Sequence, residues 1–124
     1  SVLFPSSALA ENTIVDGLAG RGIRTQRVDT YTTVPANWAP ADLARAQAAR
    51  LVTFGSPSAV RVWAERVGTA ATAVCIGETT AAEARKCGFG NVAAPSATPG
   101  RNRKALAEAW AACCAGAMEG LALR

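Results

Sequence analysis

The chain of 124 residues contains no histidine. This absence excludes Ser-His-Asp and Cys-His nucleophilic sites, and it removes the commonest metal ligand. No C-x-x-C pair occurs either, so a zinc site is not expected. We expect all four cysteines to be free and structural, in a reducing compartment. They are Cys75, Cys87, Cys113 and Cys114.

Long apolar runs and nucleotide motifs are also lacking. No run approaches the ~20 residues that a membrane-spanning helix needs. The opening SVLFPSSALAENT has neither the basic start nor the long apolar stretch of a signal peptide. Gly55 and Gly77 belong to neither a G-x-G-x-x-G pattern nor a P-loop, so an NAD or ATP site is not expected. We therefore expect no cofactor and no membrane partner.

Charge is modest and scattered. Thirteen Lys and Arg against nine Asp and Glu give a net charge of +4, and aromatic residues make up 6% of the chain. The longest basic cluster is the short GRNRK at 100–104. A nucleic-acid partner is not expected from this pattern, whereas a small anionic ligand is compatible with it.

What the sequence does contain is a regular alternation of apolar strands and amphipathic helices. Half of the residues are apolar, enough for a real core. Short apolar strands without alternation are typical of parallel sheets covered by helices, so we predict a doubly wound α/β fold. The predicted strands are 1–5, 23–35, 51–55, 73–77 and 89–95. The predicted helices are 6–22, 36–50, 56–68, 78–88 and 100–119.

Local signals mark several helix ends. Ser56 followed by Pro57 predicts an N-cap and a first helical residue. Thr80 and Glu83 form an S/T-x-x-E capping box, and Gly88 is expected to end the same helix in a left-handed conformation.

Three strand-to-helix junctions carry small hydroxyl residues, and in a parallel sheet all of them would face one edge. A helix N-terminus offers free N–H groups to a carboxylate or phosphate. The pattern therefore indicates an anion-binding rim, although simple N-capping accounts for the same residues. The hydroxyl residues are Ser6 and Ser7, Ser56 and Ser58, and Thr79 and Thr80.

The order of these segments resembles the uroporphyrinogen-III synthase family, and most of all its plant and algal members. The resemblance covers residues 2 to about 110. The segments that resemble the family are VLFPSSALAENTIVDGLAGRGI, VDTYTTVP, VTFGSPSAVRVW and AVCIGETTAAEARKCGFGNVAAPSATPG.

The resemblance implies a two-domain α/β enzyme with a cleft between its domains. Residues 1–27 would then end one domain, residues 28–36 would form a connector, and residues 37–124 would make most of the second domain. Because the chain opens directly on a strand with Ser1, we expect a fragment that corresponds to the C-terminal half of such an enzyme.

The reaction implied is the cyclisation of hydroxymethylbilane to uroporphyrinogen III, with loss of water and inversion of ring D. Tyr31 matches the connector tyrosine and would assist departure of the hydroxyl. The six hydroxyl residues of the junctions would bind substrate carboxylates. The resemblance further implies a plastid location, a small-molecule substrate, no cofactor and a monomer.

Two alternatives stay open at this point. One is a non-catalytic α/β module that binds an anionic small molecule through the same junctions, and the other is an inactive or purely structural fragment. The segment YTTVP favours the enzyme, because a simple anion binder has no need of such a connector.

Overall fold

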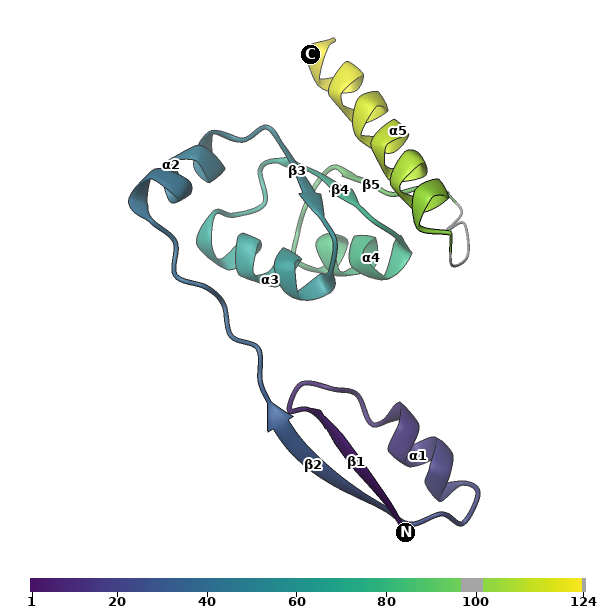
Figure 1. Cartoon of the computed structure of the whole chain (residues 1–124). Coiled ribbons are helices and arrows are strands. Elements are labelled where there is room, and N and C mark those ends of the chain that lie inside the picture. Colours follow the sequence, from purple (N-terminus) through teal and green to yellow (C-terminus); the bar gives the residue numbers. More distant parts are fainter. Residues whose placement is uncertain (97–101, 124) are drawn as a thin grey trace. The chain divides into compact units, whose positions relative to one another are not determined.

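The computed structural model describes residues 1–96 and 102–123. The chain forms two compact units, residues 1–37 and residues 38–124. Strands and helices alternate through both units, as the apolar pattern predicts, and every strand pair is parallel (Figure 1). The mixed α/β class with parallel sheets and flanking helices is thereby confirmed.

The first unit contains β1 (Val2–Ser7), α1 (Thr13–Ala19) and β2 (Thr25–Tyr31). The two strands pair in parallel from Val2 opposite Thr25 to Ser7 opposite Tyr31, with a register shift between Ser6 and Ser7. The helix packs against β2. This is a single β-α-β unit.

The first unit corrects three predicted boundaries. Pro5 does not close the first strand, because β1 has a neighbour on one side only among the described residues, and proline is tolerated on such an edge. The first helix does not begin at Ser6 but at Thr13, after a loop. The second strand is also shorter than predicted and ends at Tyr31.

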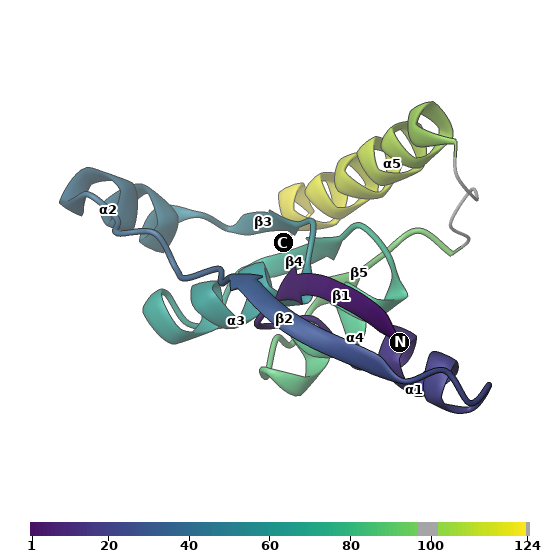
Figure 2. The same ribbon diagram turned by 60° about the horizontal axis from the view of Figure 1, so that its bottom comes forward.

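The second unit is a β3–β4–β5 sheet between two layers of helices. Helices α3 and α4 lie against each other on one face, and α5 covers β3 and β4 from the other (Figures 1 and 2). The strands are β3 (Leu51–Phe54), β4 (Thr72–Cys75) and β5 (Val92–Ala93). The helices are α2 (Pro40–Ala48), α3 (Pro57–Arg66), α4 (Glu78–Lys86) and α5 (Arg103–Ala122).

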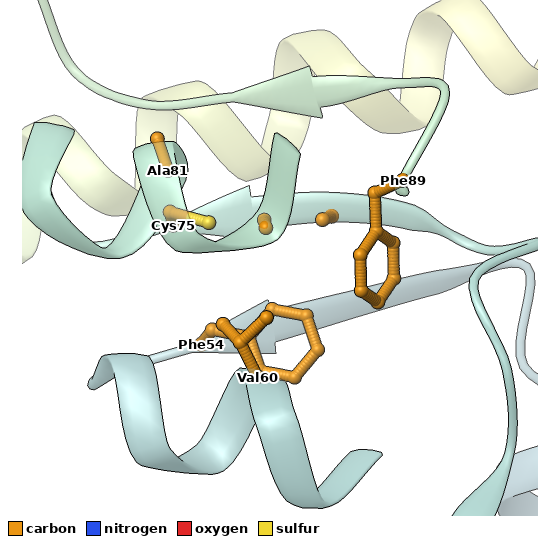
Figure 3. Packing of buried hydrophobic residues seen from close by; sticks show 7 residues of the cluster. Phe54, Val60, Cys75, Ala81 and Phe89 are labelled. Atoms are coloured by element: carbon orange, nitrogen blue, oxygen red, sulfur yellow. The ribbon is translucent and has the colours of Figure 1, made fainter. Parts of the chain in front are cut away.

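The core of the second unit lies between the sheet and helices α3 and α4 (Figure 3). Phe54 makes edge-to-face contacts with Phe89 and Trp63, with ring centroids 5.5 and 6.0 Å apart. Alanines on α4 allow its backbone to pack closely on the sheet. The buried members are Phe54, Val60, Ala73, Cys75, Ala81, Ala84 and Phe89.

The opposite face of the sheet is covered by α5. The indole Nε1 of Trp110 donates a hydrogen bond to the carbonyl oxygen of Val74 at 3.3 Å. Val74 is fully buried, and Leu106, Trp110 and Cys113 of α5 are half-buried. Trp38, which precedes α2, packs against Trp63, and the centroids of the two rings are 6.1 Å apart.

Candidate functional site

The carboxyl ends of β3 and β4 define the candidate edge of the second unit. Because the strands are parallel and adjacent, the helices that follow them begin at the same edge of the sheet. Helix α3 starts at Pro57 and α4 starts at Glu78. Their N-termini bring Ser56, Ser58 and Thr79 to this edge.

The start of α3 is capped as the sequence predicts. Ser56 has an extended backbone, and its Oγ accepts a hydrogen bond from the backbone N–H of Ala59 at 3.3 Å. The hydroxyl of Ser58 lies 3.2 Å from the Ser56 hydroxyl, and Ser58 is exposed. The first turn of α3 contains no acidic residue. The positive end of the helix dipole is therefore open to an anion at Ser58.

The start of α4 differs from the prediction. Its N-cap is Gly77, without a side-chain hydrogen bond, so the capping box of Thr80 and Glu83 is wrong. The helix begins earlier, and Thr80 lies inside its first turn with 4% of its surface exposed. Thr79 is exposed at the edge instead. Glu78 adds a negative charge at this edge. The charge is partly balanced by an ion pair with Arg85, whose Nη1 lies 2.5 Å from Glu78 Oε1.

The basic residues at the start of α5 are a further candidate for a carboxylate contact. This helix follows β5, and its N-cap Asn102 accepts a hydrogen bond from the backbone N–H of Ala105 at 3.2 Å. Arg103 and Lys104 are exposed in its first turn, and no acidic residue lies there. The basic segment GRNRK at 100–104 is the sequence feature that indicates this positive charge. Its first two residues lie outside the described residues.

In the first unit, Ser7 and Tyr31 are brought together at the ends of β1 and β2. They are register partners, and the N–H of Ala8 donates a hydrogen bond to the Tyr31 carbonyl at 2.8 Å. The Tyr31 side chain is 64% exposed. Ser7 Oγ accepts from the N–H of Leu9 at 3.2 Å. Ser7 thus shapes the loop that begins beside Tyr31.

Ser6 occupies a different environment. It is 8% exposed, and its hydroxyl has no hydrogen-bond partner among the described residues. Ser6 and Ser7 do not cap a helix, because α1 begins only after Asn12. The expectation of a helix N-terminus at this junction is therefore wrong.

Burial shifts the pKa of one core side chain in the second unit. Burial raises the pKa of the Cys75 thiol from 9.0 to about 11, with a partial offset from Arg85. Cys75 is consequently a neutral thiol near neutral pH and behaves as a small apolar residue. All four cysteines are free.

Residues 1–96 and 102–123 contain neither a metal-ligand cluster nor a membrane-spanning helix. No group of three or more Cys, Asp or Glu side chains is arranged to hold a metal ion there. Within the same ranges, no helix has the length and apolar content needed to cross a bilayer.

Comparison with known proteins identifies the family. Residues 1–101 match the family described as Uroporphyrinogen-III synthase HemD. A rice (Oryza sativa subsp. japonica) protein named Uroporphyrinogen-III synthase, chloroplastic, is 43% identical over 104 residues. That alignment covers 80% of this chain and 34% of the rice protein, so the chain spans about a third of the relative's length. The chain belongs to the uroporphyrinogen-III synthase family.

Proposed function

We propose that the protein containing this chain is a uroporphyrinogen-III synthase, a hydro-lyase that closes hydroxymethylbilane to uroporphyrinogen III with inversion of ring D. The observation that carries the proposal is the family match over residues 1–101. This range contains Tyr31 and every hydroxyl residue of the three junctions.

The substrate is a flexible polycarboxylate, and the candidate edge has the chemistry to receive it. Ser58 and Thr79 offer exposed hydroxyls beside free backbone N–H groups, which bind carboxylates without a charged side chain. Ser56 keeps the start of α3 in its capped geometry. Arg103 and Lys104 add exposed positive charge at the start of α5. Thr80 is buried inside the first turn of α4, and Ser6 is buried in β1 of the first unit, so we propose no carboxylate contact for either hydroxyl.

Tyr31 is proposed to act on the leaving group. The phenol transfers its proton to the hydroxymethyl oxygen of the substrate, which leaves as water while the lone pair of the pyrrole nitrogen expels it. The pyrrole N–H proton then returns to the phenolate. Hydroxymethylbilane also closes spontaneously to the wrong isomer, so the main task of the protein is to hold one folded geometry. This task requires no cofactor.

The proposed location of this protein rests on the same rice relative. The name of the rice protein contains the word chloroplastic, and we propose a plastid location for this protein too. We further propose that it acts as a monomer on a small-molecule substrate, without a nucleic-acid partner.

The test is an isomer assay on the complete protein that contains this chain. Freshly prepared hydroxymethylbilane is supplied, the products are oxidised, and type I is resolved from type III porphyrin. We expect an excess of type III over a blank without protein. Type I alone, from protein whose circular dichroism shows a folded α/β domain, would contradict the proposal and favour a non-catalytic anion binder.

A further inference from the structure

Arg27 is the most highly connected side chain of the first unit. It is half-buried on β2, and its guanidinium donates toward the loop that joins β1 to α1. Its Nη1 contacts the Asn12 side chain at 2.8 Å and the Ala10 carbonyl at 3.1 Å. Its Nη2 contacts the carbonyls of Ser7 at 3.0 Å and Ala8 at 3.1 Å.

The fifth contact fixes the guanidinium itself. Nε of Arg27 donates to Asp29 Oδ1 at 2.8 Å, two residues along the same strand. Residues i and i+2 of a strand lie on one face, so Asp29 holds the guanidinium in a single orientation. All five N–H donors of the arginine are then engaged.

The loop depends on this side chain for its conformation. Residues 8–12 are neither helix nor strand. The carbonyl of Ser7 at the end of β1, two carbonyls of the loop and the Asn12 side chain converge on Arg27. Hydrogen bonds to a charged donor are stronger than those between neutral groups. Without Arg27, these carbonyls would turn to water and the loop would sample other conformations.

The loop lies directly beside Tyr31. Its first N–H, that of Ala8, donates to the Tyr31 carbonyl, and Ser7 is the register partner of Tyr31. The hydroxyl of Thr30 also donates to the carbonyl of Ser6 at 3.0 Å. Movement of residues 7–12 would therefore displace the end of β2 and change the orientation of the Tyr31 side chain.

We propose that Arg27 is a positioning residue that holds the loop of residues 7–12 against the end of β2 and so sets the orientation of Tyr31. Its catalytic consequence rests on the proposed synthase function, whereas its effect on the loop does not. Lysine cannot replace it, because an ammonium has three donors without the planar fork that reaches several carbonyls at once.

The experiment uses the complete protein with Arg27→Lys, and Arg24→Lys serves as the matched control. Arg24 is an exposed arginine that immediately precedes β2. Hydrogen exchange of the peptide spanning residues 7–12 is measured by mass spectrometry, together with kcat and KM for type III formation. Asn12→Ala, which removes one acceptor, is the milder second variant.

For Arg27→Lys we expect exchange in residues 7–12 to be ~10-fold faster, while exchange in the β3–β4–β5 core is unchanged. We expect kcat to fall by ~10-fold or more with KM altered less than about twofold, because the tyrosine is misplaced while carboxylate binding persists. Asn12→Ala should shift both readouts in the same direction by less, and Arg24→Lys should shift neither.

Unchanged exchange in residues 7–12 of Arg27→Lys would overturn the proposal. Faster exchange with wild-type kcat would overturn the link to Tyr31. If the wild-type protein forms no type III product, the synthase proposal and the catalytic consequence fail together, and the exchange data alone decide whether Arg27 holds the loop.

Discussion

Tyr31 is the residue whose exposure and position carry the chemistry proposed for this protein. Its ring is 64% exposed at the end of β2, next to Ser7. We expect Tyr31→Phe to lower kcat on the order of 10²-fold, as loss of a proton donor to a leaving group does. KM should change little, because the ring and the carboxylate contacts remain. Steady-state kinetics of type III formation measures both, and an unchanged kcat would remove Tyr31 from the mechanism.

Cys75 gives the protein a pH dependence that can be measured. Its pKa in the folded chain is about 11 against an ordinary value of 9.0. Between these values the folded state binds more protons than the unfolded state, so stability falls as pH rises from about 9 to about 11. We expect urea unfolding midpoints to decline across this window and the decline to be reduced in Cys75→Ala. An equal slope in both proteins would contradict the assignment.

Site residues were predictable where a local signal decides their position. Ser56 was placed correctly as an N-cap, because serine before proline favours the start of a helix. At the start of α4 the local signal was misleading, because the capping-box pattern pointed to Thr80, whereas Gly77 precedes the first turn. The role of Arg27 could not be predicted, because its acceptors are backbone carbonyls of a distant loop.

At the scale of elements, the end of α4 shows how one glycine stops a helix. Gly88 has a φ of +99°, the N–H of Gly88 donates to the Arg85 carbonyl, and the N–H of Phe89 donates to the Ala84 carbonyl. This is a Schellman motif, and it returns Phe89 to the core. The predicted glycine at the end of this helix is confirmed.

We expect Gly88→Ala to destabilise the protein by about 1 kcal/mol, because an L-residue is strained in the left-handed region. An added Cβ would meet nothing closer than Thr69 Oγ1 at 4.0 Å, so the cost comes from the backbone and not from a clash. Gly90→Ala is the control, since its Cβ would have open space and its φ is not positive. Denaturant unfolding should separate the two variants, and equal stabilities would contradict the strain argument.

Element order and strand direction were predictable from the alternation of apolar strands and amphipathic helices. The ends of the strands and helices were harder to predict in the first unit. Ser6 and Ser7 were assigned to a helix, but they lie in β1, since pairing with β2 continues past Pro5. Tertiary pairing overrode the local signal there, and no pattern in the sequence encodes that partner.

At the scale of the whole molecule, the residues proposed for function come from both compact units. Tyr31 and Ser7 belong to residues 1–37, and the hydroxyl edge belongs to residues 38–124. The predicted domain limits 1–27 and 37–124, and the connector 28–36, stay predictions about the longer protein. The chain spans about a third of its rice relative, so complete activity is expected only from the complete protein.

Substrate carboxylates are proposed to bind at the edge where α3 and α4 begin. The most direct test places a negative charge there by Ser58→Asp, with Ala70→Asp as the control. Ser58 is the second residue of α3, whereas Ala70 is exposed before the amino end of β4. An acidic residue in the first turn of α3 should stabilise the fold by about 0.5 kcal/mol.

The measurement is KM for hydroxymethylbilane in the complete protein. We predict that Ser58→Asp raises KM ~10-fold or more through like-charge repulsion, even though the fold is no less stable. Ala70→Asp should leave KM within about twofold of wild type, because exposed charges far from the ligand are screened. Equal KM values for Ser58→Asp and wild type would contradict the account, and the carboxylates would have to bind elsewhere.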